Sequence, residues 1–431
     1  MSVFLLPEEI WMHVFKYLSK SDRMEVRSCC KYFKRLVDHR SLWKDEIIVL
    51  RRIRSYNSNF WKTLRCRMLT AVVVVNPNIK ECKQIVTSLP WLRSVTIDLS
   101  NVDSDVLTNL SSLRELKRLV IRTCHRSLAL AKSLILLPQL EHLSVCRILN
   151  SVRSDIMTAI SQLCNLTSLH YHEGLSPIPK KTFHALLKSL PKLKHLSLRM
   201  WTGHGSLPDD YLNLSRVALD SPGLHNGNNG LTSLELLNYM DPMLSPVALK
   251  HLPFLESLTV KYISRATEPS TCHLSAWLQS LGHLTELSVT NGHPFSAYAD
   301  SLPRNLRTLS LTGMMVEPGA MASAGKKVPD ILHLRYDPFV FNGPSYVAEI
   351  PGVFPLLQTL KVRSHSVSEK DLPWLGEMHQ MRHLVILDAR PGHCPLSSDL
   401  LCKLQDLTGY RVHVVLSGDA IDPAACLCDL Y

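Results

Sequence analysis

The chain has 431 residues, of which 45% are hydrophobic and 20% are charged, and its formal net charge is +11. This composition is typical of a globular protein and excludes extensive disorder, collagen-like repeats and a disulfide-packed miniprotein. The positive charge is concentrated in residues 1–70, which hold 15 Lys and Arg against 7 Asp and Glu, while the remaining residues hold 33 against 30. A nucleic-acid-binding body usually carries a basic stripe with a reading motif, and the sequence contains none, so we expect no nucleic-acid binding.

The beginning of the sequence favours neither export nor membrane insertion. Pro7, Glu8 and Glu9 interrupt its short apolar stretch, which has no basic leader, so we expect no signal peptide. The most apolar run elsewhere, 71–75, is far shorter than the ~20 residues of a membrane helix. The twelve cysteines are scattered and include no CxxC pair, a pattern typical of reduced thiols. We therefore expect a cytoplasmic or nuclear protein without membrane contact and without a cofactor.

Residues 1–45 carry apolar residues at helical spacing. The first helix is expected to hold them at positions 10, 11, 14, 15 and 18. The second is expected to begin at Asp22, with Glu25 completing a capping box, and to continue to Val37. About 40 residues are too few to bury this much apolar surface alone, so the segment must pack on the rest of the chain or on another protein. A role limited to capping the body of the chain is the alternative.

Residues 46–88 are expected to be a helical linker that forms the N-terminal cap of the body. From 89 to 407 one template recurs, apolar-x-x-apolar-x-x-apolar-x-apolar. Its third position falls at residues 95, 119, 143, 169, 196, 234, 258, 287, 309, 334, 360 and 384, about 26 residues apart on average. The last two apolar positions alternate as in a half-buried strand, and the rest of each unit has helical spacing.

This pattern resembles a leucine-rich-repeat array. It predicts an α/β fold, a right-handed horseshoe solenoid of about twelve repeats with a parallel concave sheet and helices on the convex side. One interval is long because of an insertion at about 202–230, expected as a surface loop that is either a tolerated flexible segment or part of a binding face. Residues 408–431 are expected to form the C-terminal cap and tail, where Cys428 stands in surroundings that do not favour prenylation.

The N-terminal segment resembles the F-box, a helical motif that binds the Skp adaptor of cullin-RING ubiquitin ligases. The resemblance covers residues 5–45 and rests on Leu-Pro-Glu-Glu-Ile at 6–10, Val-Phe at 14–15, Tyr-Leu at 17–18 and Leu-Trp at 42–43. Followed by leucine-rich repeats, it is similar to the F-box/leucine-rich-repeat family. The resemblance implies that the adaptor is faced by Leu6, Pro7, Ile10, Val14, Phe15 and Leu18. That surface is supported or extended by Val26, Cys30, Leu36, Leu42 and Trp43. The sequence departs from the family pattern at Arg23, Cys29 and Phe33, and Arg23 is expected to place a charge near the adaptor.

The resemblance also implies a function. The chain would be the substrate-recognition subunit of an SCF ubiquitin ligase, joined through the Skp adaptor to the cullin and RING subunits, and would not be an enzyme itself. The alternative is a leucine-rich-repeat scaffold that binds a partner without ubiquitination. The sequence contains no Walker loop and no convincing hydrolase triad, so we expect no catalytic residues. An enzymatic function through clustered His and Cys residues is a third hypothesis.

The residues that flank the repeat anchors are expected on the concave face, where they offer a substrate-binding surface. The basic and His members are Arg118, Arg122, His142, His170, His172, His195, Arg199, Arg335, Lys361 and Arg363. Because arginine pairs with carboxylate and phosphate oxygens, we expect an acidic or phosphorylated protein substrate, with an unselective hydrated face as the alternative. Three neighbouring predicted strands also bring together potential zinc ligands, namely His142, Cys146, His170, His172 and His195. Since such faces often carry His by chance, we expect no metal.

Overall fold

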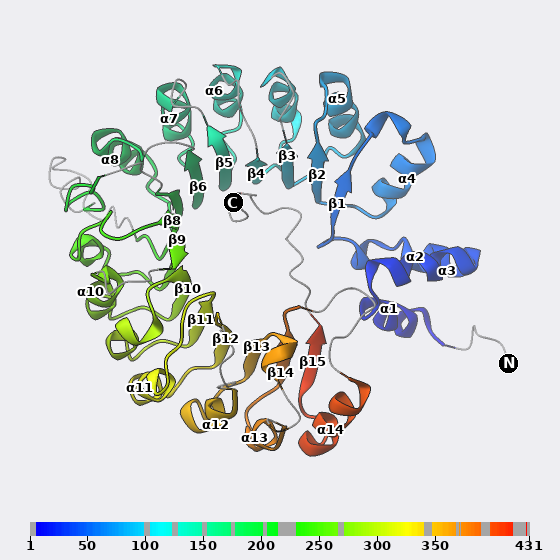
Figure 1. Cartoon of the computed structure of the whole chain (residues 1–431). Coiled ribbons are helices and arrows are strands. Elements are labelled where there is room, and N and C mark those ends of the chain that lie inside the picture. Colours follow the sequence, from blue (N-terminus) through cyan, green and yellow to red (C-terminus); the bar gives the residue numbers. More distant parts are fainter. Residues whose placement is uncertain are drawn as a thin grey trace. The chain divides into compact units, whose positions relative to one another are not determined.

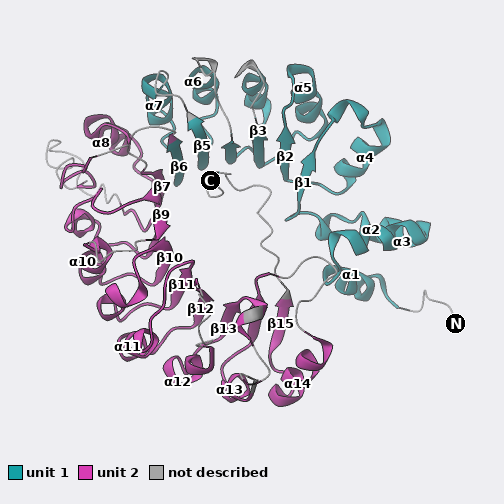
Figure 2. Cartoon of the chain, viewed as in Figure 1, with its two compact units in different colours: residues 1–172, 422–431 teal, residues 173–421 magenta. Residues whose placement is uncertain are grey.

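The computed structural model describes residues 6–98, 104–122, 128–148, 153–173, 177–200, 205–213, 230–265, 271–339, 347–367, 370, 372–388, 397–416 and 428. The chain divides into two compact units (Figure 2). Unit 1 contains residues 1–172 and 422–431, and unit 2 contains residues 173–421. Most of the predicted insertion at 202–230 and of the predicted tail at 408–431 lies outside the described residues.

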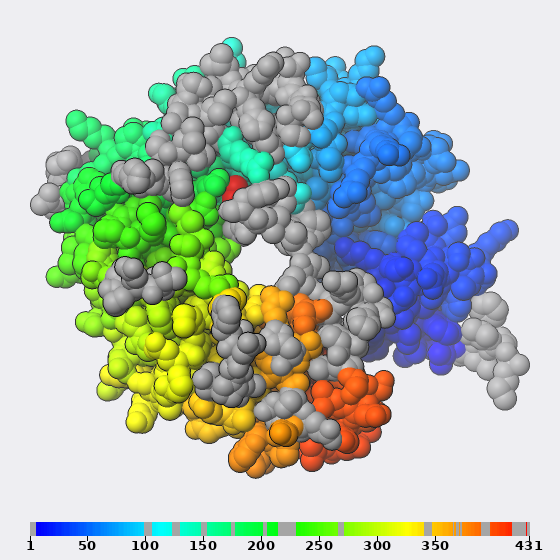
Figure 3. Space-filling view, in the orientation of Figure 1, coloured from blue at the N-terminus to red at the C-terminus, as the bar shows by residue number. Residues whose placement is uncertain are grey.

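Unit 1 begins with three short helices, α1 (Glu8–Lys16), α2 (Lys20–Cys29) and α3 (Lys31–Val37). A capping box at Ser19 and Asp22 starts α2, three residues earlier than the sequence predicted. The single second helix expected to reach Val37 is in fact two helices. Cys30 adopts an extended conformation between them, and its sulfur accepts a hydrogen bond from the Phe33 amide, which caps α3. The helices form a lobe, dark blue in Figure 3, at the start of unit 1.

The rest of unit 1 alternates strands and helices, and the strands lie side by side in chain order (Figure 1). The elements are β1 (Ile47–Leu50), α4 (Ser58–Cys66), β2 (Ala71–Val75), α5 (Ile79–Ser88), β3 (Ser94–Asp98), η4 (Ser104–Ser112), β4 (Arg118–Ile121), α6 (Leu128–Ile135), β5 (His142–Ile148), α7 (Arg153–Ser161) and β6 (Ser168–Glu173). The pairing is parallel wherever its register is described, for example Val72 with Val95 and Val95 with Leu119. Helices lie on the outer side of each strand.

Unit 2 repeats the same plan in an arc with its strands on the inner side (Figure 2). Its strands are β7 (His195–Arg199), β8 (Ser233–Tyr239), β9 (Ser257–Arg265), β10 (Glu286–Gly292), β11 (Thr308–Thr312), β12 (His333–Asp337), β13 (Thr359–Val362), β14 (His383–Ile386) and β15 (His413–Leu416). Its helices are α8 (Lys180–Ser189), η6 (Ala248–His251), α10 (His273–Ser280), α11 (Ala320–Lys327), α12 (Ile350–Val353), α13 (Leu372–Glu377) and α14 (Ser398–Thr408), with short 3₁₀ turns in some repeats.

The repeat anchors form the core of both units. All twelve predicted third anchors stand at the second position of a strand, from Val95 in β3 to Leu384 in β14, and each is almost fully buried. Equivalent anchors pair in register, as Leu309 with Leu334. Burying one such side chain contributes about 1.5–3 kcal/mol, so stacked repeats are stabilised by a shared core. The predicted α/β leucine-rich-repeat fold is confirmed.

The predicted boundaries of the array need correction. Segment 46–88 was expected to be helical, but it contains β1 and β2, which pair in parallel with each other and with β3. At the other end β15 follows residue 407 and pairs with β14. The repeats therefore start and end beyond 89–407, because a strand with weaker anchors can still pair with a well-formed neighbour. Within the described part of the chain, no helix is long and apolar enough to cross a membrane.

Candidate functional site

Helix α1 presents an apolar stripe to solvent. Ile10, Val14 and the C-cap residue Tyr17 follow one another at intervals of four and three residues, which places them on one helical face, and Leu6 lies just before the helix. Their exposed fractions are 45%, 47%, 41% and 76%. Apolar side chains gathered in this way favour a protein-binding surface, because scattered single residues are the norm on other surfaces. We call Leu6, Ile10, Val14 and Tyr17 the α1 stripe.

The opposite face of α1 holds the lobe together. Trp11, Phe15 and Phe33 form a cluster in which the ring centroids of Trp11 and Phe33 are 5.0 Å apart and those of Phe15 and Phe33 are 5.7 Å apart. Both contacts are edge-on, the arrangement that aromatic rings prefer. Phe33, one of the three departures from the family pattern, therefore packs inside the lobe.

The second departure, Arg23, is also internal. Its guanidinium donates hydrogen bonds to the carbonyl oxygens of Phe15 at 2.9 Å, Leu42 at 2.9 Å and Lys16 at 3.1 Å, and it pairs with Glu46 at 3.1 Å. The prediction that Arg23 places a charge near the adaptor is wrong, because its side chain is only 9% exposed and points inward. Phe15 and Lys16 lie in the last turn of α1, where the Phe15 carbonyl also accepts a 3.3 Å hydrogen bond from the Leu18 amide. Arg23 supplies further donors to the carbonyls at this helix end.

A second arginine–carboxylate group joins the lobe to the first repeats. The Asp38 carboxylate accepts hydrogen bonds from Arg27 at 2.8 and 2.9 Å and from Arg67 at 2.9 and 2.7 Å. Arg67 also lies 3.7 Å from the centre of the Trp43 ring. Burial acts to raise the pKa of Asp38, but the hydrogen bonds from both arginines outweigh it and hold the pKa below its ordinary value. Asp38 is thus a charged clamp between α3 and the start of the array.

The predicted adaptor-binding residues divide into three groups. Leu6, Pro7, Ile10 and Val14 are exposed, as the prediction requires, and Leu18, Val26 and Cys30 are half-buried. Phe15 is buried within the lobe, so the prediction that it faces the adaptor is wrong. Leu36, Leu42 and Trp43 are also buried, so they can support the surface but offer little area to a partner. The sequence analysis missed Tyr17 and Met24, which are apolar and exposed. Tyr17 could have been found from its spacing of three residues after Val14.

On the inner face of unit 1 the structure groups several predicted substrate-binding residues. Arg118 in β4 pairs in register with His142 in β5. The ring of His142 lies 4.9 Å from that of His170, which lies 5.9 Å from His172. His172 and Arg122 are buried, so neither offers much surface to a macromolecule, whereas Arg118, His142 and His170 are half-buried.

In unit 2 the late basic residues have an internal counterion. Arg363 bonds both carboxylate oxygens of Asp337, at 2.7 and 3.1 Å, and Arg335 lies 3.5 Å from the same carboxylate. Asp337 therefore compensates part of the positive charge expected to attract a substrate. Lys361 between them is exposed.

Two earlier positions in unit 2 are engaged as well. His195 forms a 2.7 Å hydrogen bond with Ser233, and Arg199 is half-buried at the end of β7. Glu235 accepts a hydrogen bond from Ser197 at 2.6 Å and pairs with Lys261 at 3.2 Å. This part of the inner face is a polar network with both signs of charge.

A buried polar group in unit 2 is structural. Asp241 accepts a hydrogen bond from the Tyr239 hydroxyl at 2.9 Å and lies 2.7 Å from Nε2 of His293. His273 bonds the Leu244 carbonyl at 2.7 Å beside it. Burial, followed by the nearby Asp241 charge, raises the pKa of Tyr239, which therefore stays protonated. The His293–Asp241 and His273–Leu244 contacts each join one repeat to another, so we assign the group to stability.

Comparison with known proteins identifies a family for the N-terminal residues. Residues 3–45 match the F-box-like family model. No curated protein matches the sequence. The chain is 13% identical to a chain of the Toll–Spatzle complex of Drosophila, with a TM-score of 0.40, covering 86% of this chain and 55% of that one. The chain is 13% identical to an internalin of Listeria monocytogenes, with a TM-score of 0.31, covering 84% of this chain and 83% of that one. It is 17% identical to a chain of the mouse RP105/MD-1 complex, with a TM-score of 0.37, covering 79% of this chain and 50% of that one. The chain thus spans about half the length of the matched chains of the Toll–Spatzle and RP105/MD-1 complexes.

Proposed function

From a chain that joins an F-box-like segment to leucine-rich repeats, we propose a substrate-recognition subunit of an SCF-type ubiquitin ligase. The lobe binds the Skp adaptor, and through it the cullin and RING subunits, while the repeats bind a protein substrate. The observation that carries the proposal is the α1 stripe, an exposed apolar face within the residues that match the F-box-like model. The setting of such a protein is the cytoplasm or the nucleus.

The α1 stripe suits binding in a groove. An amphipathic helix recognised in this way uses anchors at intervals of three and four residues, as Ile10, Val14 and Tyr17 are spaced. Full burial of an exposed apolar side chain contributes about 1.5–3 kcal/mol, and the three are already partly covered, so about 1 kcal/mol each remains. Arg23 and Asp38 hold α1 and α3 in place before binding, which reduces the entropy lost in the complex.

In this proposal the chain performs no bond-making step. It raises the effective concentration of substrate lysines near the ubiquitin-charged enzyme, which the RING subunit recruits. We assign substrate binding to the inner faces of the two units. The half-buried Arg118 of unit 1 and the exposed Lys361 of unit 2 each favour an acidic or phosphorylated segment, although Asp337 compensates two arginines of unit 2.

Adaptor binding tests the proposal directly. We would measure the affinity of purified Skp adaptor for the wild-type chain and for a variant with Ile10→Ala, Val14→Ala and Tyr17→Ala. Three lost anchors of about 1 kcal/mol each predict an affinity lower by roughly 100-fold. The control variant carries Ile135→Ala, Leu136→Ala and Phe254→Ala, which are comparably exposed side chains outside the lobe. Equal affinity of both variants, or no binding by the wild type, would contradict the proposal.

A second measurement separates the ligase subunit from a scaffold. The wild-type chain, assembled with adaptor, cullin and RING subunits, should promote ubiquitination of a captured substrate, and the α1-stripe variant should not. Capture that is retained without ubiquitination in the wild-type assembly would indicate the scaffold function. Charge reversal by Arg118→Glu and Lys361→Glu should weaken capture of an acidic or phosphorylated substrate, and unchanged capture would remove the acidic preference from the proposal.

A further inference from the structure

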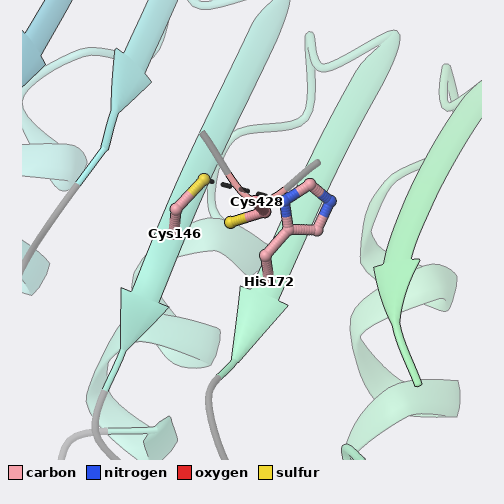
Figure 4. A group of neighbouring side chains, drawn as sticks. All are labelled: Cys146, His172 and Cys428. Atoms are coloured by element: carbon pink, nitrogen blue, oxygen red, sulfur yellow. Dashed lines mark hydrogen bonds between the residues drawn. The ribbon is translucent and has the colours of Figure 1, made fainter. Parts of the chain in front are cut away.

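Three side chains distant in the sequence converge on the inner face of unit 1. Cys146 belongs to β5, His172 belongs to β6, and Cys428 comes from the C-terminal residues that complete the unit. Their ligand atoms, two sulfurs and an imidazole nitrogen, all lie within 4.8 Å of one another. Figure 4 shows the three side chains pointing toward one another, with Cys146 Sγ 3.6 Å from Nδ1 of His172.

From this geometry we propose that Cys146, His172 and Cys428 bind a Zn²⁺ ion. Zinc bonds of about 2.3 Å to sulfur and about 2.05 Å to nitrogen, at tetrahedral angles, place a sulfur and a nitrogen ligand about 3.6 Å apart. Cys146 and His172 already have this separation. Two sulfurs in the same geometry are about 3.8 Å apart, which is within the observed limit of 4.8 Å. The ion therefore fits with small side-chain movements.

The burial, charge and soft sulfur atoms of the three ligands favour zinc over magnesium and calcium. The exposed fractions of Cys146, His172 and Cys428 are 0%, 1% and 4%. Two thiolates and a neutral imidazole balance the charge of a divalent cation, so the assembled site carries no net charge into the interior. Soft thiolate ligands select zinc and disfavour magnesium and calcium, which prefer oxygen. Ser144 lies beside the site, its hydroxyl 3.6 Å from Cys146 Sγ, where it can donate a hydrogen bond to the metal-bound sulfur. A water molecule completes four-coordination.

The ion has a structural consequence, because it attaches residue 428 to strands β5 and β6. A chelating group that joins distant parts of a chain restricts the unfolded state and stabilises the folded one. This position also gives Cys428 a role that does not involve prenylation, because a buried, metal-bound sulfur is inaccessible to a prenyltransferase. Attachment of residue 428 to the inner face of unit 1, where Arg118 and His142 also lie, would therefore depend on the metal.

Cobalt titration of the full-length chain tests the site. The purified chain, stripped of metal and held in reductant, is titrated with Co²⁺, and Zn²⁺ is then added as a competitor. We expect one Co²⁺ per chain, with the thiolate-to-cobalt charge-transfer and intense d–d absorption of a tetrahedral thiolate site, and displacement by Zn²⁺. Absence of this absorption in the reduced wild-type chain would overturn the proposal.

Variants identify the ligands. Cys146→Ser, His172→Ala and Cys428→Ser should each weaken binding by more than the roughly 10–100-fold that outer-shell partners contribute. Cys164→Ser, which changes an exposed cysteine of unit 1, should bind as the wild type does. Cys428→Ser is decisive because it leaves β5 and β6 intact, and circular dichroism checks its fold. Unchanged affinity of the folded Cys428→Ser chain would overturn the site.

Discussion

Replacing Arg23 by methionine should loosen the N-terminal lobe. Methionine retains much of the aliphatic packing of arginine but removes the guanidinium that bonds the carbonyls of Phe15, Leu42 and Lys16 and pairs with Glu46. The Phe15 and Leu42 carbonyls would lose their arginine donor in a buried position, whereas Lys16 and Glu46 are partly exposed and can be solvated.

The expected loss follows from the two buried bonds. A hydrogen bond to a charged donor contributes about 1.5–3 kcal/mol. The lower figure applies here, because the Phe15 carbonyl keeps its hydrogen bond from the Leu18 amide. Two bonds at the lower figure give about 3 kcal/mol, and the screened contacts to Lys16 and Glu46 add less than about 1 kcal/mol. The free energy of opening of α1 and α2 should therefore fall by about 3 kcal/mol, while the repeats keep their stability.

Native-state hydrogen exchange of the α1 and α2 amides measures this local free energy, which a single melting temperature of a chain with two units does not. The matched control is Arg35→Met, which removes an exposed arginine from the same lobe, where it pairs with Glu8. Exposed pairs contribute at most about 1 kcal/mol, so exchange should change little. Equal effects of the two variants would show that the Arg23 contacts do not brace the lobe.

Two further changes test the clamp and a close helix contact. Asp38→Asn should cost about 3 kcal/mol at neutral pH, since it leaves the Arg67 charge buried without its partner. The pKa of Asp38 is lower in the folded chain, so the stability that its carboxylate contributes is present above the unfolded pKa and is lost as pH falls through the folded pKa. The difference between variant and wild type, measured by hydrogen exchange of the α3 amides, should therefore shrink below about pH 4. Gly325→Ala should destabilise unit 2 by about 1–3 kcal/mol, because the new Cβ would lie 2.9 Å from the Val353 carbonyl oxygen. The higher helix propensity of alanine offsets roughly 0.5–1 kcal/mol of this loss. Gly282→Ala, with no atom within 4 Å, is its control.

Each of these predictions has a result that would refute it. A stability difference between Asp38→Asn and the wild type that persists unchanged at low pH would assign the loss to packing. Equal melts of Gly325→Ala and Gly282→Ala would show that the contact between α11 and α12 adjusts without cost.

The sequence determined the repeat fold because the relevant information is local. The spacing of apolar residues defines which side of a short strand is buried, and twelve copies of one spacing place twelve strands with their anchors inward. The same reasoning placed Ile10 and Val14 on an apolar stripe of the first helix, and the family resemblance assigned them to the exposed, adaptor-facing side. It failed for their neighbour Phe15, because two adjacent apolar residues of a helix are equivalent in the sequence, and only packing against Phe33 decides which turns inward.

The tertiary structure decided the features that depend on distant partners. Arg23 looked like a surface charge until the carbonyl of Leu42 and the carboxylate of Glu46 were placed beside it. Cys428 had no metal-ligand spacing with any other cysteine, because its partners lie on strands from the middle of the chain. Local spacing specifies which face of an element is buried, but a buried polar contact requires the folded positions of both partners. For that reason the sequence determined the architecture, and the structure alone identified the bracing residues and the proposed zinc ligands.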